Sequence, residues 1–120
     1  MAKEFNVRVE GVADVLKMFD SVSADEAIRD IEKITETYTR KMARDAADMA
    51  PIKTGRLKNS LAASPRKAED EELTWIWGSD VPYATRQEYE HKSKKGFVRK
   101  AIYGNMKDYR GAIERRLTKG

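Results

Sequence analysis

"SADEAIRDIEKITETYTRKMARDAADMAP", residues 23–51, is the stretch that decides the fold. Apolar side chains recur in it every three or four residues, which is the spacing of one face of an α-helix. Ser23 and Glu26 form a capping box at its start, and Pro51 ends it because a proline ring disfavours helical geometry at the preceding residue. We therefore expect a helix over residues 24–50, roughly 40 Å long.

This expected helix is long compared with the domain that would contain it. A domain of 120 residues has a radius of gyration of only about 14 Å. The helix should therefore span the whole molecule or project beyond it. Its second half is rich in alanine, which permits close approach of another backbone, either a sheet of the same chain or a neighbouring subunit. These alanines are Ala43, Ala46, Ala47 and Ala50.

Shorter periodic segments flank the long helix. Residues 5–9, FNVRV, alternate apolar and polar side chains and predict a strand, whereas the apolar residues of 12–19 follow helical spacing and predict a two-turn helix. Residues 73–80, LTWIWGSD, predict a further strand. A last amphipathic helix is expected over residues 97–117.

The order of these elements predicts one α+β domain over residues 1–120. Residues 5–22 would form the N-terminal strand and short helix, and residues 56–90 would form antiparallel strands joined by an acidic loop over 67–72. The segments GRLKNSLAAS and YATRQEY at the two ends of that region are also compatible with helical turns. The expected architecture is a small antiparallel sheet of three to four strands packed against one long helix and a C-terminal helix.

Composition narrows the classes of function. The chain has no cysteine, which excludes a disulfide framework, a thiol nucleophile and a thiolate metal site. The N-terminus lacks an apolar signal segment, and no window approaches the roughly 18 apolar residues that a membrane span needs. We therefore expect a soluble protein that is made in a cytoplasm and has no membrane partner.

Charge is unevenly distributed along the chain. Residues 91–120 hold ten lysines and arginines against Asp108 and Glu114, a net charge of +8, so residues 1–90 carry −4 of the total of +4. This asymmetry indicates an acidic partner for the basic part, either nucleic acid or the acidic part of a neighbouring copy. A solvated helix face followed by a loose tail explains it equally well.

The sequence offers few of the residues from which a catalytic site is built. His91 is the only histidine, so no catalytic triad or histidine-rich metal cluster can be assembled, and we expect no catalytic residue, no cofactor and no metal. One weak alternative is a Mg²⁺-dependent nuclease, because Asp80, Glu90 and Lys92 resemble the Asp…Glu-x-Lys arrangement of restriction-type nucleases if that segment is extended.

A second alternative is a DNA-binding module in the basic C-terminal third. Phe97, Tyr103 and Tyr109 could stack on bases while the basic residues contact phosphates. Tyr109 lies in the apolar stripe of the last helix, however, which favours a place in the core. No helix-turn-helix, zinc-finger or ribbon motif is visible.

Aromatic residues are concentrated around the Trp-containing strand. Trp75, Trp77, Tyr83 and Tyr89 place four large rings within fifteen residues. Some of these rings would pack in the core, and others would be anchors at a subunit interface, where aromatic and arginine side chains dominate the binding energy.

Three short motifs resemble a known family when read in order. The segments are APIKTGRLKNS at 50–60, YATRQEY at 83–89 and FVRKA at 97–101. Together they resemble the lambdoid gene-product-ten-like proteins of tailed bacteriophages, which belong to the head–tail joining region and are described as neck, tail-completion or minor capsid proteins. The matching residues are Ala50, Pro51, Thr54, Gly55, Leu57, Ser60, Tyr83, Ala84, Glu88, Tyr89, Phe97 and Ala101.

The chain departs from the family pattern in one region. Where members have Gly-Thr after the second aromatic residue, this chain has Glu90 and His91, and the proline-rich lead into the last helix is replaced by Lys-Ser-Lys-Lys-Gly.

The first motif also has a direct physical interpretation. Pro51 ends the long helix, Thr54 can cap the next turn, and Gly55 can adopt a backbone conformation that other residues resist. The chain reverses there and leaves Lys53 and Arg56 at a fixed corner, together with Lys58. These basic side chains could meet the acidic loop of a neighbouring subunit or DNA in a ring, or they could simply be solvated.

The resemblance implies a structural protein of the phage particle. It would be a neck or tail-completion component that assembles into a ring and docks between the head connector and the tail. Its partners would be further copies of itself and other connector and tail proteins, with non-specific DNA contact in the lumen, and it would be assembled in the host cytoplasm and located in the virion. The expected interaction residues are Lys53, Thr54, Gly55, Arg56, Trp75, Trp77, Tyr83, Glu88 and Tyr89.

Overall fold

The computed structural model describes residues 5–11, 22–51, 55–69, 73–82, 84–90 and 95–118. The elements in chain order are the strand β1 (Phe5–Glu10), the long helix α2 (Val22–Met49), the helix α3 (Arg56–Ala63), the strands β2 (Arg66–Lys67) and β3 (Thr74–Ser79), the short helix α4 (Ala84–Glu90) and the C-terminal helix α5 (Phe97–Thr118). The predicted helix over 12–19 lies outside the described residues.

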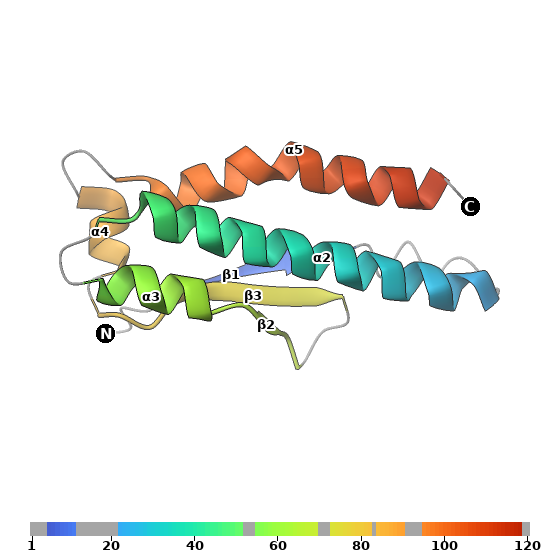
Figure 1. Cartoon of the computed structure of the whole chain (residues 1–120), viewed down its shortest axis with the longest axis horizontal. Helices are drawn as coiled ribbons and strands as arrows, with labels where there is room; N and C mark the ends of the chain where they lie inside the picture. The colour runs from blue at the N-terminus through green and yellow to red at the C-terminus, as the bar shows by residue number, and fades with distance from the viewer. Residues whose placement is uncertain are drawn as a thin grey trace.

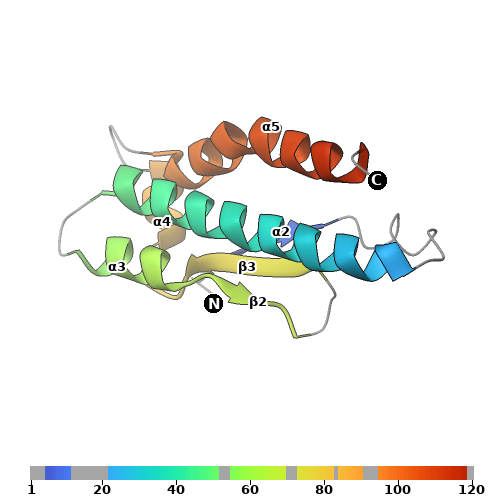
Figure 2. The same cartoon turned by 45° about the vertical axis from the view of Figure 1, so that its right-hand side comes forward.

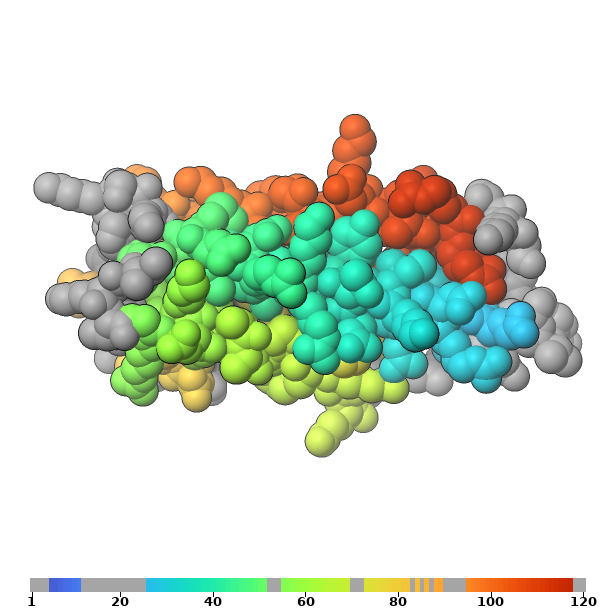
Figure 3. Space-filling view, in the orientation of Figure 1, coloured from blue at the N-terminus to red at the C-terminus, as the bar shows by residue number. Residues whose placement is uncertain are grey.

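These elements form two layers in an elongated molecule. The sheet has the strand order β1-β3-β2 with both pairings antiparallel. α2 and α3 lie on one face of it, and α5 lies beside α2, beyond the β1 edge (Figures 1 and 2). On the face seen in Figure 3, the side chains of these helices cover most of the sheet. The extents are 51 × 26 × 19 Å. The predicted α+β class, with a small antiparallel sheet against a long helix and a C-terminal helix, is confirmed.

The long helix spans most of the longest dimension, as its length predicts. α2 begins at Val22, two residues before the predicted start, and ends at Met49, just before the buried Pro51. Its alanine-rich face is buried in the core of the same chain, where α2 contacts α5, α3 and β3, so the close approach that these alanines allow is intramolecular. The alanines concerned are Ala43, Ala46, Ala47 and Ala50.

The inner face of the sheet completes the core. Val7 lies opposite Trp77 and Val9 lies opposite Trp75 in the β1–β3 register, and side chains of directly paired residues share one face of a sheet. Trp77 is completely buried, with its ring edge-on to Phe5 at a centroid distance of 6.4 Å. Gly78 is required by this packing, because a Cβ there would overlap the carbonyl oxygen of Phe5.

The expectation of strands throughout residues 56–90 is wrong at both ends of that region. α3 and α4 are helices there, and only β2 and β3 are strands. In α3 the buried residues Leu57 and Leu61 are four apart, and in α4 Ala84 and Glu88 have the same spacing. A four-residue spacing places two side chains on one side of a helix and also on one face of a strand, where the residue between them would lie on the same face. The residues in that middle position, Asn59 and Arg86, are exposed, which fits a helix and not a strand.

A buried tyrosine ties α5 to α2 and β1. The Tyr109 hydroxyl donates a hydrogen bond to the main-chain oxygen of Glu10 at 2.7 Å, so the hydroxyl of the fully buried Thr35, 2.9 Å away, donates to Tyr109. The ring also packs on Tyr38 at a centroid distance of 5.5 Å. Burial raises the pKa of Tyr109 above the usual value for a tyrosine, the Thr35 hydrogen bond opposes that rise, and the Glu10 charge adds to it.

We expect Tyr109→Phe to destabilise the fold by about 1–3 kcal/mol, because it removes two buried hydrogen bonds and leaves the ring in place. The raised pKa means that the folded state holds the tyrosine proton more tightly than the unfolded state. The stability that results is complete at pH values below the pKa of Tyr109 in the unfolded state, and it is lost as the pH rises through the pKa of Tyr109 in the folded state. The free energy of unfolding of the wild type should exceed that of Tyr109→Phe by less at about pH 11 than at about pH 8, as measured by urea unfolding. A constant difference between the two proteins would contradict this role of Tyr109.

Candidate interaction surface

The three motif segments of the sequence meet at one end of the molecule. α2 ends there, α3 and α5 begin there, and α4 lies between them at the left of Figure 1. We call this region the motif end. The strand β1 also begins on this side, whereas α5 finishes at the opposite end of the long axis.

Most motif residues at this end are buried packing residues. Ala50, Leu57, Ala84, Phe97 and Ala101 are almost completely inaccessible to solvent and belong to one hydrophobic core. Small residues allow the helix ends to approach closely, and the large Phe97 fills the space that remains. The shared motif therefore encodes the packing of the motif end.

The corner after α2 depends on a left-handed glycine. Gly55 has φ = 79° and occupies the N-cap position of α3, with its carbonyl oxygen accepting a hydrogen bond from Asn59 N at 2.9 Å. Residues with a Cβ rarely adopt this backbone conformation, as the sequence predicted. Lys53 and Thr54, including the predicted cap by Thr54, lie outside the described residues.

The remaining positive charges of this corner face solvent. Arg56 is exposed, and Lys58 lies 3.8 Å from Asp48 of α2. Lys58 is therefore paired within its own chain, next to the corner. The motif residue Ser60 points inward, and its hydroxyl lies 2.6 Å from the hydroxyl of Ser79 at the end of β3.

Glu88 joins α4 to the start of α5. Its carboxylate accepts hydrogen bonds from the main-chain N–H of Val98 at 2.8 Å and of Arg99 at 3.2 Å, and it also pairs with Arg99 Nε at 2.9 Å. A carboxylate at the positive end of a helix dipole satisfies donors that have no partner inside the helix. Glu88 is only 5% exposed, so its charge is used within the chain.

The main chain of the same region closes the connection. Glu88 O accepts a hydrogen bond from Gly96 N at 2.7 Å, and Gly96 O accepts one from Lys100 N at 2.8 Å. Gly96 has φ = 82°, so a second left-handed glycine sets the direction in which α5 leaves the motif end.

An aromatic and basic pair lies on the outside of this junction. The guanidinium carbon of Arg99 is 5.0 Å from the centre of the Tyr89 ring, within the range of a cation–π interaction. Tyr89 is 61% exposed, so the Glu88–Arg99 bridge holds a large aromatic side chain at the surface. Tyrosine and arginine are the residue types enriched at the energetic centres of protein interfaces.

The two tryptophans of β3 differ in accessibility. Trp77 is a core residue, which fits the expectation that part of the aromatic cluster packs inside the chain. Trp75 is partly exposed and lies beneath Arg40 of α2, whose guanidinium carbon is 5.4 Å from the ring centre. The structure does not describe Tyr83.

The nuclease alternative loses its geometric basis. Glu90 is the last residue of α4, so the segment that was required to be extended is helical up to that point. Asp80 is exposed directly after β3, and Lys92 lies outside the described residues. Among the described residues, no group of three or more His, Cys, Asp or Glu side chains could hold a metal ion.

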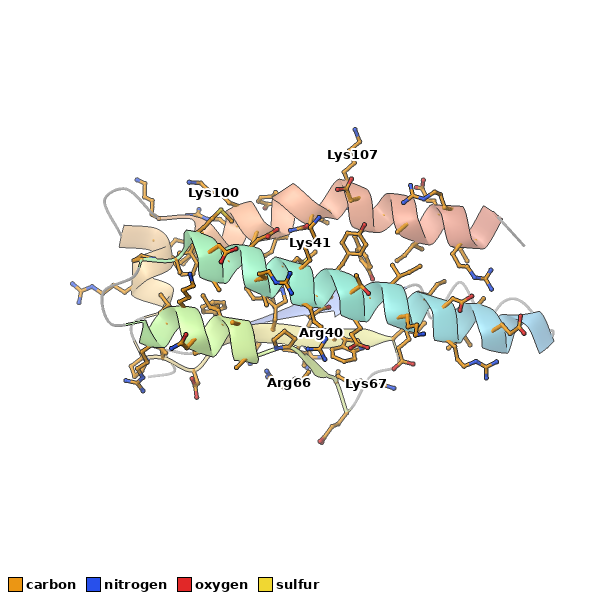
Figure 4. All side chains as sticks on the ribbon, viewed as in Figure 1. Arg40, Lys41, Arg66, Lys67, Lys100 and Lys107 are labelled. Atoms are coloured by element: carbon orange, nitrogen blue, oxygen red, sulfur yellow. The ribbon has the colours of Figure 1, made fainter. Side chains whose placement is uncertain are left out.

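The basic side chains do not gather on one face. Lys100 and Lys107 point away from α2 on the outer side of α5, whereas Arg66 and Lys67 lie at the opposite edge (Figure 4). Several cations are already paired within the chain: Lys67 with Glu32, Arg116 with Asp30 at 2.7 Å and Arg40 with Glu36 at 2.9 Å. The part of the chain that the structure describes therefore has no single basic surface of the kind that a dedicated DNA-binding module uses.

Sequence reasoning missed Arg99, Gly96 and Arg40. Nothing in the local pattern shows that a glutamate in one helix caps another helix ten residues later. The glycine after a lysine run was a usable signal for a left-handed turn before a helix. The Arg40–Trp75 contact joins elements that are far apart in the sequence.

These features define a small α+β domain in which most motif residues are buried and the motif end exposes aromatic and basic side chains. Residues 13–89 match the model of the HK97-gp10-like family. The description of this family is bacteriophage HK97 gp10, a tail component. The match covers more than half of the chain, which belongs to this family. It is thus a structural component of a phage tail, and its location is the virion.

The comparisons with curated proteins and with solved structures gave no match. No helix within the described ranges is long and apolar enough to cross a membrane.

We expect Glu88→Gln to lower the free energy of unfolding by about 1–3 kcal/mol, because the amide cannot serve all three donors and removes a charge that faces Arg99. The matched control is Glu36→Gln, which removes the carboxylate of the exposed Glu36–Arg40 pair and should cost no more than about 0.5 kcal/mol. Urea unfolding midpoints measure both. Equal losses in the two variants would show that Glu88 is an ordinary surface glutamate.

Proposed function

We propose that this tail component is a neck or tail-completion protein, which assembles into a ring and docks between the head connector and the tail. The single observation that carries this proposal is the family match over residues 13–89. Two of the three sequence motifs lie within the matched residues, and they meet the start of α5 at the motif end. The proposed mechanism is assembly through protein contacts, without catalysis.

The shape of the molecule supports a head-to-tail ring. A heterologous contact joins two different surfaces of neighbouring copies and closes into a ring when the rotation allows it. The molecule is 51 Å long and has distinct ends, because the motif end presents Tyr89 and Arg99 while the opposite end is formed by the start of α2 and the end of α5. A molecule with two different ends suits contacts in which one end of each copy always binds a different surface of the next copy.

Within the motif end we assign the contact to exposed side chains. Tyr89, with Arg99 stacked on it, and the exposed Arg56 would touch neighbouring chains. Glu88 and Gly55 would position that surface, since both are used in the local structure. The partly exposed Trp75 is a further contact candidate, and the buried Trp77 would support it from the core. The proposed roles of Lys53, Thr54 and Tyr83 rest on the sequence motif alone.

Contact with DNA in the lumen would use the outer side of α5. Lys100 and Lys107 are exposed and point away from the rest of the molecule (Figure 4). Two lysines along one helix edge suit transient phosphate contacts with DNA that passes through a ring, in which sequence is not read.

The joining role is tested by making particles without this protein. We expect filled heads and free tails in place of firmly attached ones, counted by negative-stain electron microscopy, with recovery when the wild-type chain is supplied from a plasmid. Normal numbers of stable, tailed particles would rule out the joining function.

The motif-end contact is tested by Tyr89→Ala, with Tyr103→Ala as a matched control. Both tyrosines are exposed, Tyr89 at 61% and Tyr103 at 71%, so neither substitution should unfold the chain. We expect Tyr89→Ala to reduce incorporation into particles at least about tenfold, the effect of losing about 1.4 kcal/mol of contact energy. Tyr103→Ala should be incorporated like the wild type. Equal incorporation of both variants would place the contact elsewhere.

A further inference from the structure

The outer face of α5 gathers three cations around one exposed tyrosine. Lys100, Lys107 and Arg110 are exposed, and Tyr103 is 71% exposed. Residues that are three, four or seven positions apart are neighbours on the surface of a helix. The three cations stand at these distances from Tyr103 in the sequence, so the ring lies at the centre of a local positive patch.

The charge of this patch is available to a partner. Among the described residues, the side chains of the three cations have no ion-pair partner, and Lys100 and Lys107 point away from α2 (Figure 4). Asp108 lies about 140° around the helix from the tyrosine. Glu114, one turn beyond the last cation, already has an interaction within the chain. The outer face therefore presents net positive charge to solvent.

Two glycines lie beside these cations, and packing within the chain does not explain them. Gly104 stands between Lys100 and Lys107 along the helix, and a Cβ there would meet no atom within 4 Å. At Gly111 the nearest atom would be the flexible end of Arg115, at 3.3 Å. Glycine destabilises a helix interior relative to alanine. Its benefit on this face is that a partner can approach the helix main chain closely.

We propose that the outer face of α5 binds a single nucleic-acid strand with unpaired bases. Lys100 and Lys107 are about 10 Å apart along the helix axis, and a strand that crosses between them passes over Gly104. Each ammonium group then contacts a phosphate on its own side of the crossing. Tyr103 stacks on a base beside the crossing, and Arg110 contacts a further phosphate. The identification of this strand as DNA inside a ring rests on the proposed function.

The combination of ring and cations favours an unpaired strand over other polyanions. Sites for single strands combine cations that follow the backbone with aromatic rings that stack on bases. A duplex keeps its bases stacked inside, so it would use the cations and leave Tyr103 without a role. An acidic polypeptide would also pair with the cations, but it offers no regular succession of flat bases to the ring. One copy would bind weakly through so few contacts, and copies in a ring would add theirs.

The proposal is tested by fluorescence anisotropy of a labelled thymidine oligonucleotide of about twelve nucleotides, at low salt. We expect Tyr103→Ala to weaken binding at least about tenfold, because a stack between base and ring is lost, and Tyr103→Phe to retain it. The matched control is Tyr89→Ala, which removes an exposed tyrosine elsewhere and should bind like the wild type. Equal binding by Tyr103→Ala and the wild type would overturn the proposal, as would a duplex of the same length that binds as tightly.

Two further variants locate the strand on the helix. Lys107→Gln should reduce the slope of log affinity against log salt by about 0.7, the value of one phosphate contact with a single strand. Lys67→Gln, at the opposite edge of the molecule (Figure 4), should leave the slope unchanged. Gly104→Gln should weaken binding at least about fivefold and yet raise the urea unfolding midpoint, because glutamine is the better helix former. Unchanged binding by Gly104→Gln would overturn the crossing over this glycine.

The remaining outcomes separate this proposal from the proposed function. Normal tailed particles in the absence of the protein would end the joining role and leave the oligonucleotide result standing. Failure of the wild type to bind the oligonucleotide would end only the present proposal. Polyglutamate that binds with the same dependence on Tyr103, or a dimer in analytical ultracentrifugation that Gly104→Gln abolishes, would assign the face to a protein partner and overturn the nucleic-acid proposal.

Discussion

The fold depends on one helix that must bury two faces. α2 contacts α3 and β3, and a second face, with Thr35, Tyr38 and Met42, meets α5 and the end of β1. A three-stranded sheet alone is too small to cover a helix of 28 residues. α5 therefore packs beside α2 instead of on the sheet. This arrangement places α5 past the β1 edge of the sheet.

Polar groups fix the positions that apolar burial leaves free. Apolar contacts are not directional and would allow α5 to slide along α2. The Glu88 carboxylate sets the start of α5, Tyr109 sets its middle, and the bond from Asn105 Nδ2 to Asp45 at 2.9 Å adds a point between them. These three sites hold the helix in one register, so the exposed residues of the motif end keep a constant geometry.

The parts of the fold that repeat over several turns could be predicted from the sequence. α2 and α5 carry their apolar stripes over many residues, and Pro51 marks the end of the first. The short helices α3 and α4 could not be distinguished from strands, because a single pair of buried residues four apart fits both until the exposure of the residues between them is known. The aromatic cluster showed the same limit, since periodicity places Trp75 and Trp77 on one face but does not show that only Trp77 is completely buried. The Glu88–Arg99 bridge was invisible, because its geometry comes from two helices meeting at the motif end.

The described chain has a direction along the long axis of the molecule. β1 begins on the side of the motif end, and α5 finishes at the other extremity of the 51 Å axis. In the ring proposed above, copies that follow one another would therefore all point the same way. Such a ring would have two unlike rims, and this difference would distinguish the capsid side from the tail side without an additional protein to set the orientation.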